Sequence, residues 1–246
     1  MSEPAPDPDQ EARAAATDLA RRLADDWLAA SDLDLIGVYL IGSLAHGGFS
    51  RLYSDIDLAL VSRAVLPPPT LDRLRRDAVA LSAAWGPRIS VFWGNRDFSV
   101  GRFPPLDRVD LLDNAVTLIE RERARPPRPT LTEIRDYLRG APFADWAERA
   151  RAFAADGALA PRDRKAYLRA LLYPARLCFS WATGRMGGND EAVAFLQEQR
   201  PAGLDVDLVA RALECRHASA DPDDLFPARD ALPRQVEACE AFIRGS

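Results

Sequence analysis

Apolar residues in the first part of the chain follow two different spacings. Between about residues 10 and 30 they recur every three or four positions, which predicts an amphipathic helix. These helix-spaced residues are Ala16, Leu19, Leu23, Trp27 and Leu28. Two continuous apolar runs follow, Leu35 to Ile41 and Leu58 to Val61, and short runs of this kind are typical of buried strands. The pattern therefore predicts a helix followed by two strands.

The next segment mixes helical and strand-like patterns. Pro67-Pro68-Pro69 breaks the chain, and Thr70 can cap a helix that extends to about Trp85. The remaining elements expected here are a strand at Arg88–Trp93, a short helix at Leu106–Asp113 and a strand at Val116–Ile119. Strands interleaved with helices indicate an α/β domain, which we expect to be a small mixed sheet flanked by helices.

Helical periodicity dominates the second half of the chain. Residues 124–129 read Ala-Arg-Pro-Pro-Arg-Pro, a composition typical of a stiff linker. The segments with helical spacing beyond it are Leu131–Arg139, Pro142–Ala155, Pro161–Thr183, Asp190–Glu198, Asp205–Ser219 and Leu232–Ile243. Gly184 and Gly187-Gly188 are expected to end the third of them. We therefore expect a disordered tail at 1–9, an α/β domain at 10–123, a linker at 124–129 and an all-α helical bundle at 130–246.

Composition and charge narrow the classes of protein. The 246 residues are 48% hydrophobic and 28% charged, as in ordinary globular proteins. No apolar run is long enough to cross a membrane and the N-terminus is unlike a signal peptide, so we expect a cytoplasmic protein. The net charge of −5 disfavours a nucleic-acid substrate and favours a cationic partner. Cys178, Cys215 and Cys239 lack a metal-ligand or disulfide pattern and are expected to be reduced and buried.

The strongest chemical signal lies at the ends of the two apolar runs. Gly42-Ser43 follows the first run, and Asp55-Ile56-Asp57 begins the second. Side chains two apart on a strand share a face, so Asp55 and Asp57 can present two carboxylates that suit Mg²⁺. Gly42 lets the backbone N–H approach a phosphate, and the Ser43 hydroxyl can add a further donor. Either motif alone is common in solvated turns, but their placement together favours a site for a metal ion and a nucleotide triphosphate.

The motif resembles the signature of the DNA polymerase beta-type nucleotidyltransferase superfamily, a Gly-Ser followed about ten residues later by Asp-x-Asp. The resemblance implies that the α/β domain is a nucleotidyltransferase domain, with Asp55, Asp57 and Ser43 as catalytic residues. It also implies that Gly42, Ser43, Asp55 and Asp57 bind ATP with two Mg²⁺ ions. His46, in the intervening loop, is more typical of a polar surface residue than of a catalytic one.

The second half resembles the helical domain of bacterial aminoglycoside (streptomycin/spectinomycin) adenylyltransferases. The resembling segment, residues 173–192, carries an arginine and aromatic residues, then Thr183-Gly184-Arg185, then a polar residue, Asp190-Glu191 and an alanine. The resemblance implies a two-domain enzyme that transfers AMP from ATP to a hydroxyl group, with the helical domain binding the substrate. Taken alone, the apolar residues of this segment are typical of a helical core.

One expected residue is missing. The resemblance implies a general-base carboxylate on the third strand, but residues 87–93 read Pro-Arg-Ile-Ser-Val-Phe-Trp. Arg88 and Ser90 are expected on one face of this strand, and Ile89, Val91 and Trp93 on the other. Asp97 lies beyond the expected end of the strand. A general base contributes about 10²- to 10⁴-fold to a rate, so its absence bears directly on catalysis.

Three functions remain open on this basis. The first is adenylyl transfer to a small cationic, aminoglycoside-like molecule that bears a hydroxyl group. Its amines would be held by acidic residues of the helical domain, and the first candidates among them are Asp145, Glu148, Asp190 and Glu191. The second is a degenerate protein that binds nucleotide or ligand without catalysis, and the third is a transferase acting on a protein or tRNA. The sequence does not indicate the oligomeric state.

Overall fold

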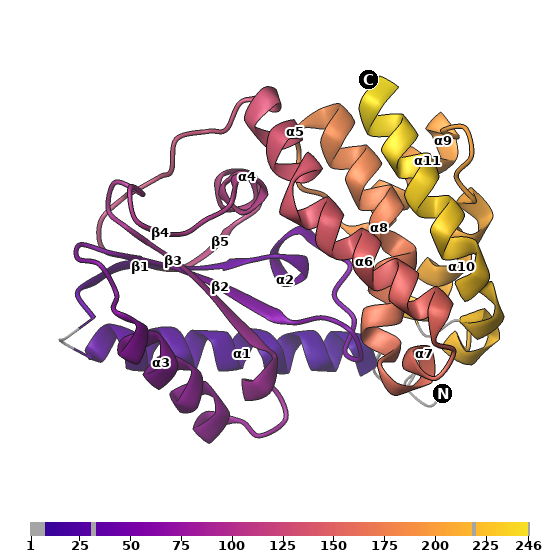
Figure 1. The fold of residues 1–246 in the computed structure, drawn as a ribbon. Helices are drawn as coiled ribbons and strands as arrows, with labels where there is room; N and C mark the ends of the chain where they lie inside the picture. Colours follow the sequence, from indigo (N-terminus) through magenta and orange to yellow (C-terminus); the bar gives the residue numbers. More distant parts are fainter. Residues whose placement is uncertain (1–7, 31–32, 218–219, 246) are drawn as a thin grey trace, which may run out of the picture. The chain divides into compact units, whose positions relative to one another are not determined.

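The computed structural model describes residues 8–30, 33–217 and 220–245. The chain divides into two compact units, residues 1–129 and 130–246. Residues 1–7 of the expected disordered tail lie outside the described residues. Pro8 and Asp9, expected in that tail, instead begin helix α1 (Pro8–Ala29), because proline and an acidic residue are both favourable in a first helical turn (Figure 1).

A five-stranded mixed sheet forms the centre of the first unit. The strands are β1 (Leu35–Ile41), β2 (Ile56–Ser62), β3 (Ile89–Asn95), β4 (Gly101–Arg102) and β5 (Val116–Glu120). Their order is β4-β3-β2-β1-β5, and the β2–β3 pair is parallel whereas the other three pairs are antiparallel. The predicted mixed sheet is confirmed.

Helices cover both faces of this sheet, because alternate residues of the central strands point to opposite sides. Leu40 and Leu58 pack with α1 and with α3 (Pro68–Leu81) on one face. Ile41 and Ala59 pack on the other face with Leu111, which belongs to α4 (Pro105–Asp113). Figure 1 shows α1 and α3 on one side of the sheet and α4 on the other. Asp57 shares a face with Ala59 and therefore lies on the side of α4.

Several element boundaries differ from the sequence prediction. Helix α3 ends at Leu81 rather than Trp85, because Ser82 is extended and a short 3₁₀ helix, η1 (Gly86–Arg88), follows. A Cβ on Gly86 would lie 2.4 Å from the Ala78 carbonyl oxygen, so this turn packs against the backbone of α3. Arg88 consequently lies in η1 and not on the third strand. The pattern also missed β4 and the four-residue helix α2 (Ser43–His46), both too short to show periodicity.

The second unit is helical, as predicted. Its elements are α5 (Leu131–Arg139), α6 (Ala141–Ala155), α7 (Leu159–Arg162), α8 (Arg164–Thr183), α9 (Asn189–Gln199), α10 (Val206–Arg216), the 3₁₀ segment η2 (Pro222–Ala231) and α11 (Leu232–Gly245). Helix α8 packs against α5, α6, α9, α10 and α11 and forms the core of this unit. The predicted helix Pro161–Thr183 is in fact two helices, because Asp163 is non-helical and its carboxylate caps α8 at the Ala166 N–H. Gly184, at φ 67°, ends α8 as expected.

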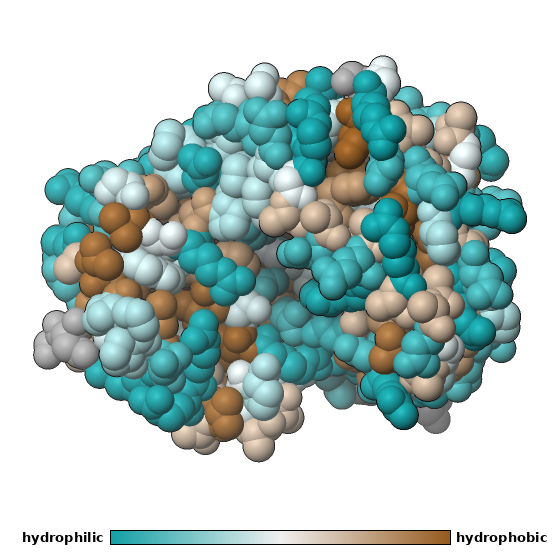
Figure 2. Space-filling model, viewed as in Figure 1, coloured by the Kyte–Doolittle hydropathy of each residue, from teal (hydrophilic) through white to brown (hydrophobic). Residues whose placement is uncertain are grey.

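The surface is mainly polar on the face drawn in Figure 2, with smaller apolar patches between the polar side chains. Large apolar residues that are well exposed include Leu52, Val65, Val79 and Val100 of the first unit and Leu131 of the second. Single exposed apolar residues of this kind are normal in folded proteins. In the part of the chain that the structure describes, no helix combines the length and the apolar character needed to span a membrane.

Candidate active site

Gly42 and Asp57 come together where β1 ends and β2 begins. Ile41, the last residue of β1, pairs with Asp57 in the antiparallel register, and Gly42 follows directly. Gly42 has φ 68° and ψ −156°, and a Cβ built on it would lie 2.3 Å from Asp57 Oδ2. The position therefore requires glycine for two reasons, its backbone conformation and the carboxylate packed against it.

The N–H group of Gly42 already has a partner within the protein. It donates to Asp110 Oδ2 at 2.6 Å, and the other oxygen of that carboxylate accepts from Asn114 Nδ2 at 2.8 Å. Asp110 lies on α4 and is 1% exposed. The N–H that we expected to face a phosphate is thus hydrogen-bonded within the protein. What the glycine provides is room for the Asp57 carboxylate, because Gly42 has no Cβ.

Sequence reasoning missed Asp110. The available signal was a carboxylate between Val109 and Leu111, two apolar residues of a short helix, with Asn114 one turn later. An acidic residue buried among apolar neighbours normally needs hydrogen-bond donors. The sequence gives no indication that the donor is Gly42, 68 positions away.

The Ser43 hydroxyl stands at the start of the short helix α2. The N–H groups of Ala45 and His46 donate to the Gly42 carbonyl at 2.9 and 3.0 Å, which closes this turn. Arg13 of α1 donates to the Leu44 carbonyl at 3.2 Å and ties the turn to the rest of the first unit. Ser43 is partly exposed at this turn, next in the chain to the glycine that contacts Asp57.

Asp55 precedes the first residue of β2, beside a turn held by Arg88. One guanidinium nitrogen of Arg88 donates to the Arg51 carbonyl at 2.6 Å, and another donates to the Ser54 carbonyl. The guanidinium also stacks on Trp85, with 4.5 Å to the ring centroid. Burial lowers the pKa of Arg88, and the nearby charge of Asp55 opposes that shift. Asp55 therefore has a cation within electrostatic reach.

The third strand carries no carboxylate near Asp57. Ser90 is its register partner on β3, so the two side chains are neighbours on the same face. Asp97 lies in the turn after β3, where its Oδ1 accepts from Ser99 N at 3.0 Å and Ser99 Oγ at 2.7 Å. Those hydrogen bonds lower the pKa of Asp97. Asp97 thus shapes the turn and is not placed next to Asp57 in the register.

Among the described residues, no metal site is built from protein side chains alone. Within residues 8–30, 33–217 and 220–245, no three or more His, Cys, Asp or Glu side chains come together to hold a metal ion. A metal bound at Asp55 and Asp57 would complete its shell with water and phosphate oxygens. Mg²⁺ typically binds in this way, so the donor set fits Mg²⁺ better than a structural zinc site.

The acidic residues expected to bind a cationic substrate are placed differently from one another. Asp190 Oδ1 lies 2.7 Å from His217 Nε2, and Glu191 Oε1 lies 3.0 Å from an Arg185 nitrogen. Asp145 and Glu148 are exposed on α6. All four side chains are exposed, and Asp190 and Glu191 in addition lie within salt-bridge distance of a basic side chain.

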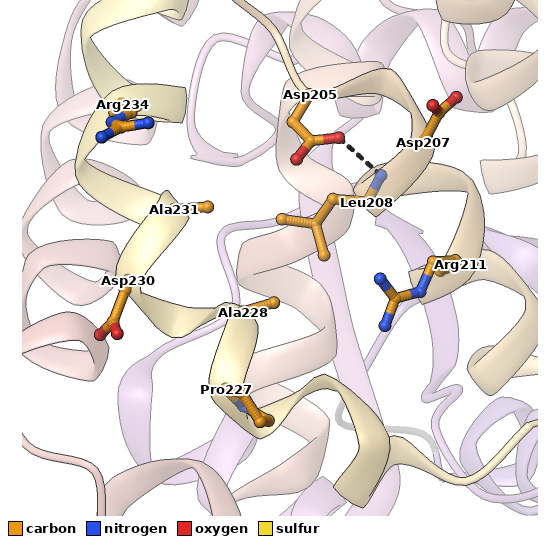
Figure 3. A pocket seen from close by; sticks show the side chains of 9 residues that line it. All are labelled: Asp205, Asp207, Leu208, Arg211, Pro227, Ala228, Asp230, Ala231 and Arg234. Atoms are coloured by element: carbon orange, nitrogen blue, oxygen red, sulfur yellow. Dashed lines mark hydrogen bonds between the residues drawn. The ribbon is translucent and has the colours of Figure 1, made fainter.

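A separate pocket of about 560 Å³ lies in the second unit, between the start of α10, the end of η2 and the start of α11 (Figure 3). Its polar lining residues are Asp205, Asp207, Arg211, Asp230 and Arg234. Asp205 Oδ1 accepts from the Leu208 N–H at 2.9 Å and caps α10. None of the four expected substrate carboxylates lines this pocket.

Neither a known protein-family profile nor a curated protein matches the sequence. Among solved structures, the fold is similar to that of spectinomycin adenyltransferase AAD(9) from Enterococcus faecialis, crystallised with ATP and spectinomycin. The TM-score is 0.63, the sequence identity is 11%, and the match covers 92% of this chain and 98% of that chain. The predicted resemblance in fold to streptomycin/spectinomycin adenylyltransferases is confirmed, and at this identity the comparison bears on the fold alone.

Proposed function

We propose that this protein, which has the fold of an adenylyltransferase, transfers AMP from ATP to a hydroxyl group of a small molecule in a Mg²⁺-dependent reaction. One observation carries the proposal: the Asp57 carboxylate packs against Gly42 at the meeting point of β1 and β2. The Gly-Ser and Asp-x-Asp motifs, separated along the chain, are therefore one structural unit at Gly42 and Asp57.

The roles follow from the chemistry of each group. Asp55 and Asp57 would hold Mg²⁺, and the Ser43 hydroxyl, next to Gly42, would donate to the triphosphate. When bound, Mg²⁺ neutralises the phosphate oxygens and favours ionisation of the attacking hydroxyl. The hydroxyl oxygen forms a bond to the α-phosphorus, the bond from that phosphorus to pyrophosphate breaks, and the hydroxyl proton passes to solvent. The products are an AMP ester and pyrophosphate.

The proposed acceptor is cationic and aminoglycoside-like. The net charge of −5 supports a cationic ligand, and the structurally similar adenyltransferase was crystallised with spectinomycin. Asp190 already contacts the His217 ring and Glu191 already pairs with Arg185, so a substrate amine would have to displace His217 or Arg185. Asp145 and Glu148 are therefore the first candidates for contacts with substrate amines.

A degenerate binding protein is the second candidate. Ser90 stands beside Asp57 where a third carboxylate would be expected, and Arg88 places a positive charge near Asp55. Both features reduce the negative charge available to a metal and leave no carboxylate base on β3. Such a protein would bind Mg·ATP or a ligand without forming a product.

The test combines the protein, Mg²⁺ and each nucleoside triphosphate with a panel of hydroxyl-bearing antibiotics and detects adducts by mass spectrometry. The parent is expected to form an AMP adduct, and Asp57→Asn is expected to form none, because the metal loses a charged ligand. Asp72→Asn, an exposed carboxylate on α3, is the matched control and should behave like the parent.

Three outcomes separate the candidates. Product formation that Asp57→Asn abolishes supports the transferase. Tight Mg·ATP binding by calorimetry without product on any acceptor favours the degenerate binder. Absence of both binding and product, or full activity of Asp57→Asn, would overturn the metal site at Asp55 and Asp57.

A further inference from the structure

Gly42 donates its N–H to Asp110, and the Asp57 carboxylate packs against the same glycine. From this geometry we propose that Asp110 is a positioning residue, which fixes the Gly-Ser turn so that Asp57 is kept in place for the metal and nucleotide. The inference rests on the proposed function, because the site that Asp110 orders is the one assigned there to Mg·ATP.

The Asp110 carboxylate is held from several directions. One oxygen accepts the Gly42 N–H at 2.6 Å, the other accepts Asn114 Nδ2 at 2.8 Å, and the side chain is 1% exposed. Its neighbours Val109 and Leu111 are 0% and 3% exposed and anchor α4 in the unit. A carboxylate this deeply buried is tolerated only when donors satisfy its oxygens, so its position is strongly determined.

Gly42 is the part of the turn that most needs such a restraint. Its φ of 68° is a conformation that glycine adopts freely, but glycine is also the residue that leaves it most easily. Rotation of the peptide between Ile41 and Gly42 would change how closely the backbone approaches Asp57 Oδ2. The hydrogen bond from the Gly42 N–H to Asp110 opposes this rotation.

A role for Asp110 as the missing general base is not compatible with these contacts. Both oxygens accept hydrogen bonds inside the protein, and almost none of the side chain is accessible to a substrate hydroxyl. Asp110 acts on the chemistry through Gly42 and not by touching the reacting atoms.

The experiment compares Asp110→Ala, which removes both hydrogen bonds, with Asp110→Asn, whose amide oxygen can still accept from Gly42 while Asn114 turns its own amide. Asp113→Asn, on the same helix and exposed, is the matched control. Exchange of the Gly42 amide proton is followed by NMR without nucleotide, Mg·ATP affinity by calorimetry, and folding by thermal unfolding.

In Asp110→Ala we expect Gly42 amide exchange to rise and Mg·ATP affinity to fall, each by about 10- to 100-fold, the usual effect of losing a hydrogen bond to a charged group. Asp110→Asn should restore most of the slow Gly42 amide exchange and most of the Mg·ATP affinity, and Asp113→Asn should match the parent in both measurements. If folded Asp110→Ala binds Mg·ATP like the parent, or if Asp110→Asn is as impaired as Asp110→Ala, the positioning role is overturned while the proposed function stands. If the parent itself binds no Mg·ATP, the proposed function is what fails.

Discussion

Gly42 has two separate constraints that a substitution can distinguish. Its φ is 68°, and a Cβ would lie 2.3 Å from Asp57 Oδ2. Gly47, five residues later, has φ 98° but nothing within 4 Å of the position of a Cβ. The two glycines therefore share the backbone constraint, and only Gly42 has the steric one.

We predict that Gly42→Ala abolishes Mg·ATP binding and is less stable than Gly47→Ala. Each alanine costs about 1–3 kcal/mol, because both glycines combine a positive φ with an extended ψ, a conformation that is essentially reserved for glycine. Gly42→Ala adds about 1–3 kcal/mol more, because the methyl group must displace the Asp57 carboxylate. Urea unfolding and calorimetry of both variants measure this difference. Equal stability and equal binding would show that the carboxylate of Asp57 does not occupy the space beside Gly42.

At the residue scale, local pattern predicted part of the candidate site. Gly42, Ser43, Asp55 and Asp57 were identifiable because each stands at the edge of an apolar run. Their assigned roles stay predictions. Asp110 was not identifiable, because its contact with Gly42 depends on how α4 packs on the sheet and not on neighbours in sequence.

At the scale of elements, β3 presents a serine where the resemblance implies a carboxylate. Ser90 pairs with Asp57 in the parallel register, and neighbouring strands are about 4.8 Å apart. A longer acidic side chain at this position would lie beside Asp57, on the side of α4. The strand therefore offers a place to restore the missing group.

We predict that Ser90→Glu raises kcat by about 10²-fold, the lower end of what a general base supplies. The increase in kcat should require Mg²⁺, because the new carboxylate and Asp57 repel one another without a cation. Thr117→Glu, which adds a carboxylate on the exposed strand β5, serves as the control and should leave kcat unchanged. A folded Ser90→Glu variant with the parent's kcat would mean that proton removal does not limit the reaction.

Segments with a continuous apolar run or a clear helical spacing could be predicted as elements, whereas very short elements could not. Leu35–Ile41 and Leu131–Arg139 appear with the predicted limits. The break between α7 and α8 was missed, because Asp163 interrupts the backbone without interrupting the apolar spacing. Helix α2, which carries Ser43, is only four residues long and has no periodicity to detect.

At the scale of the whole molecule, net charge offers a test of the acceptor class. The chain carries 37 acidic and 32 basic residues, so a polycation should be attracted on approach and held by carboxylates. Such attraction weakens with salt, because charges more than about 8–10 Å apart are screened at physiological ionic strength.

We predict that an aminoglycoside raises the unfolding temperature in the presence of Mg·ATP, and that added salt reduces its affinity. A ligand at a hundred times its dissociation constant adds about 2.7 kcal/mol of stability. Asp145→Asn with Glu148→Gln should weaken this shift, and Asp72→Asn should not. A shift produced only by neutral or acidic hydroxyl compounds would contradict a cationic acceptor.

Arg88 anchors the Arg51–Ser54 turn, and this determines whether the segment before Asp55 becomes ordered on folding or only on ligand binding. Because the guanidinium binds two carbonyls of this turn and stacks on Trp85, the segment before Asp55 loses its conformational freedom when the chain folds. A loop that is ordered only by its ligand would lose that entropy on each binding event and would bind more weakly. This segment is instead preorganised, so a divalent cation bound at the proposed site would meet a surface already close to its final shape.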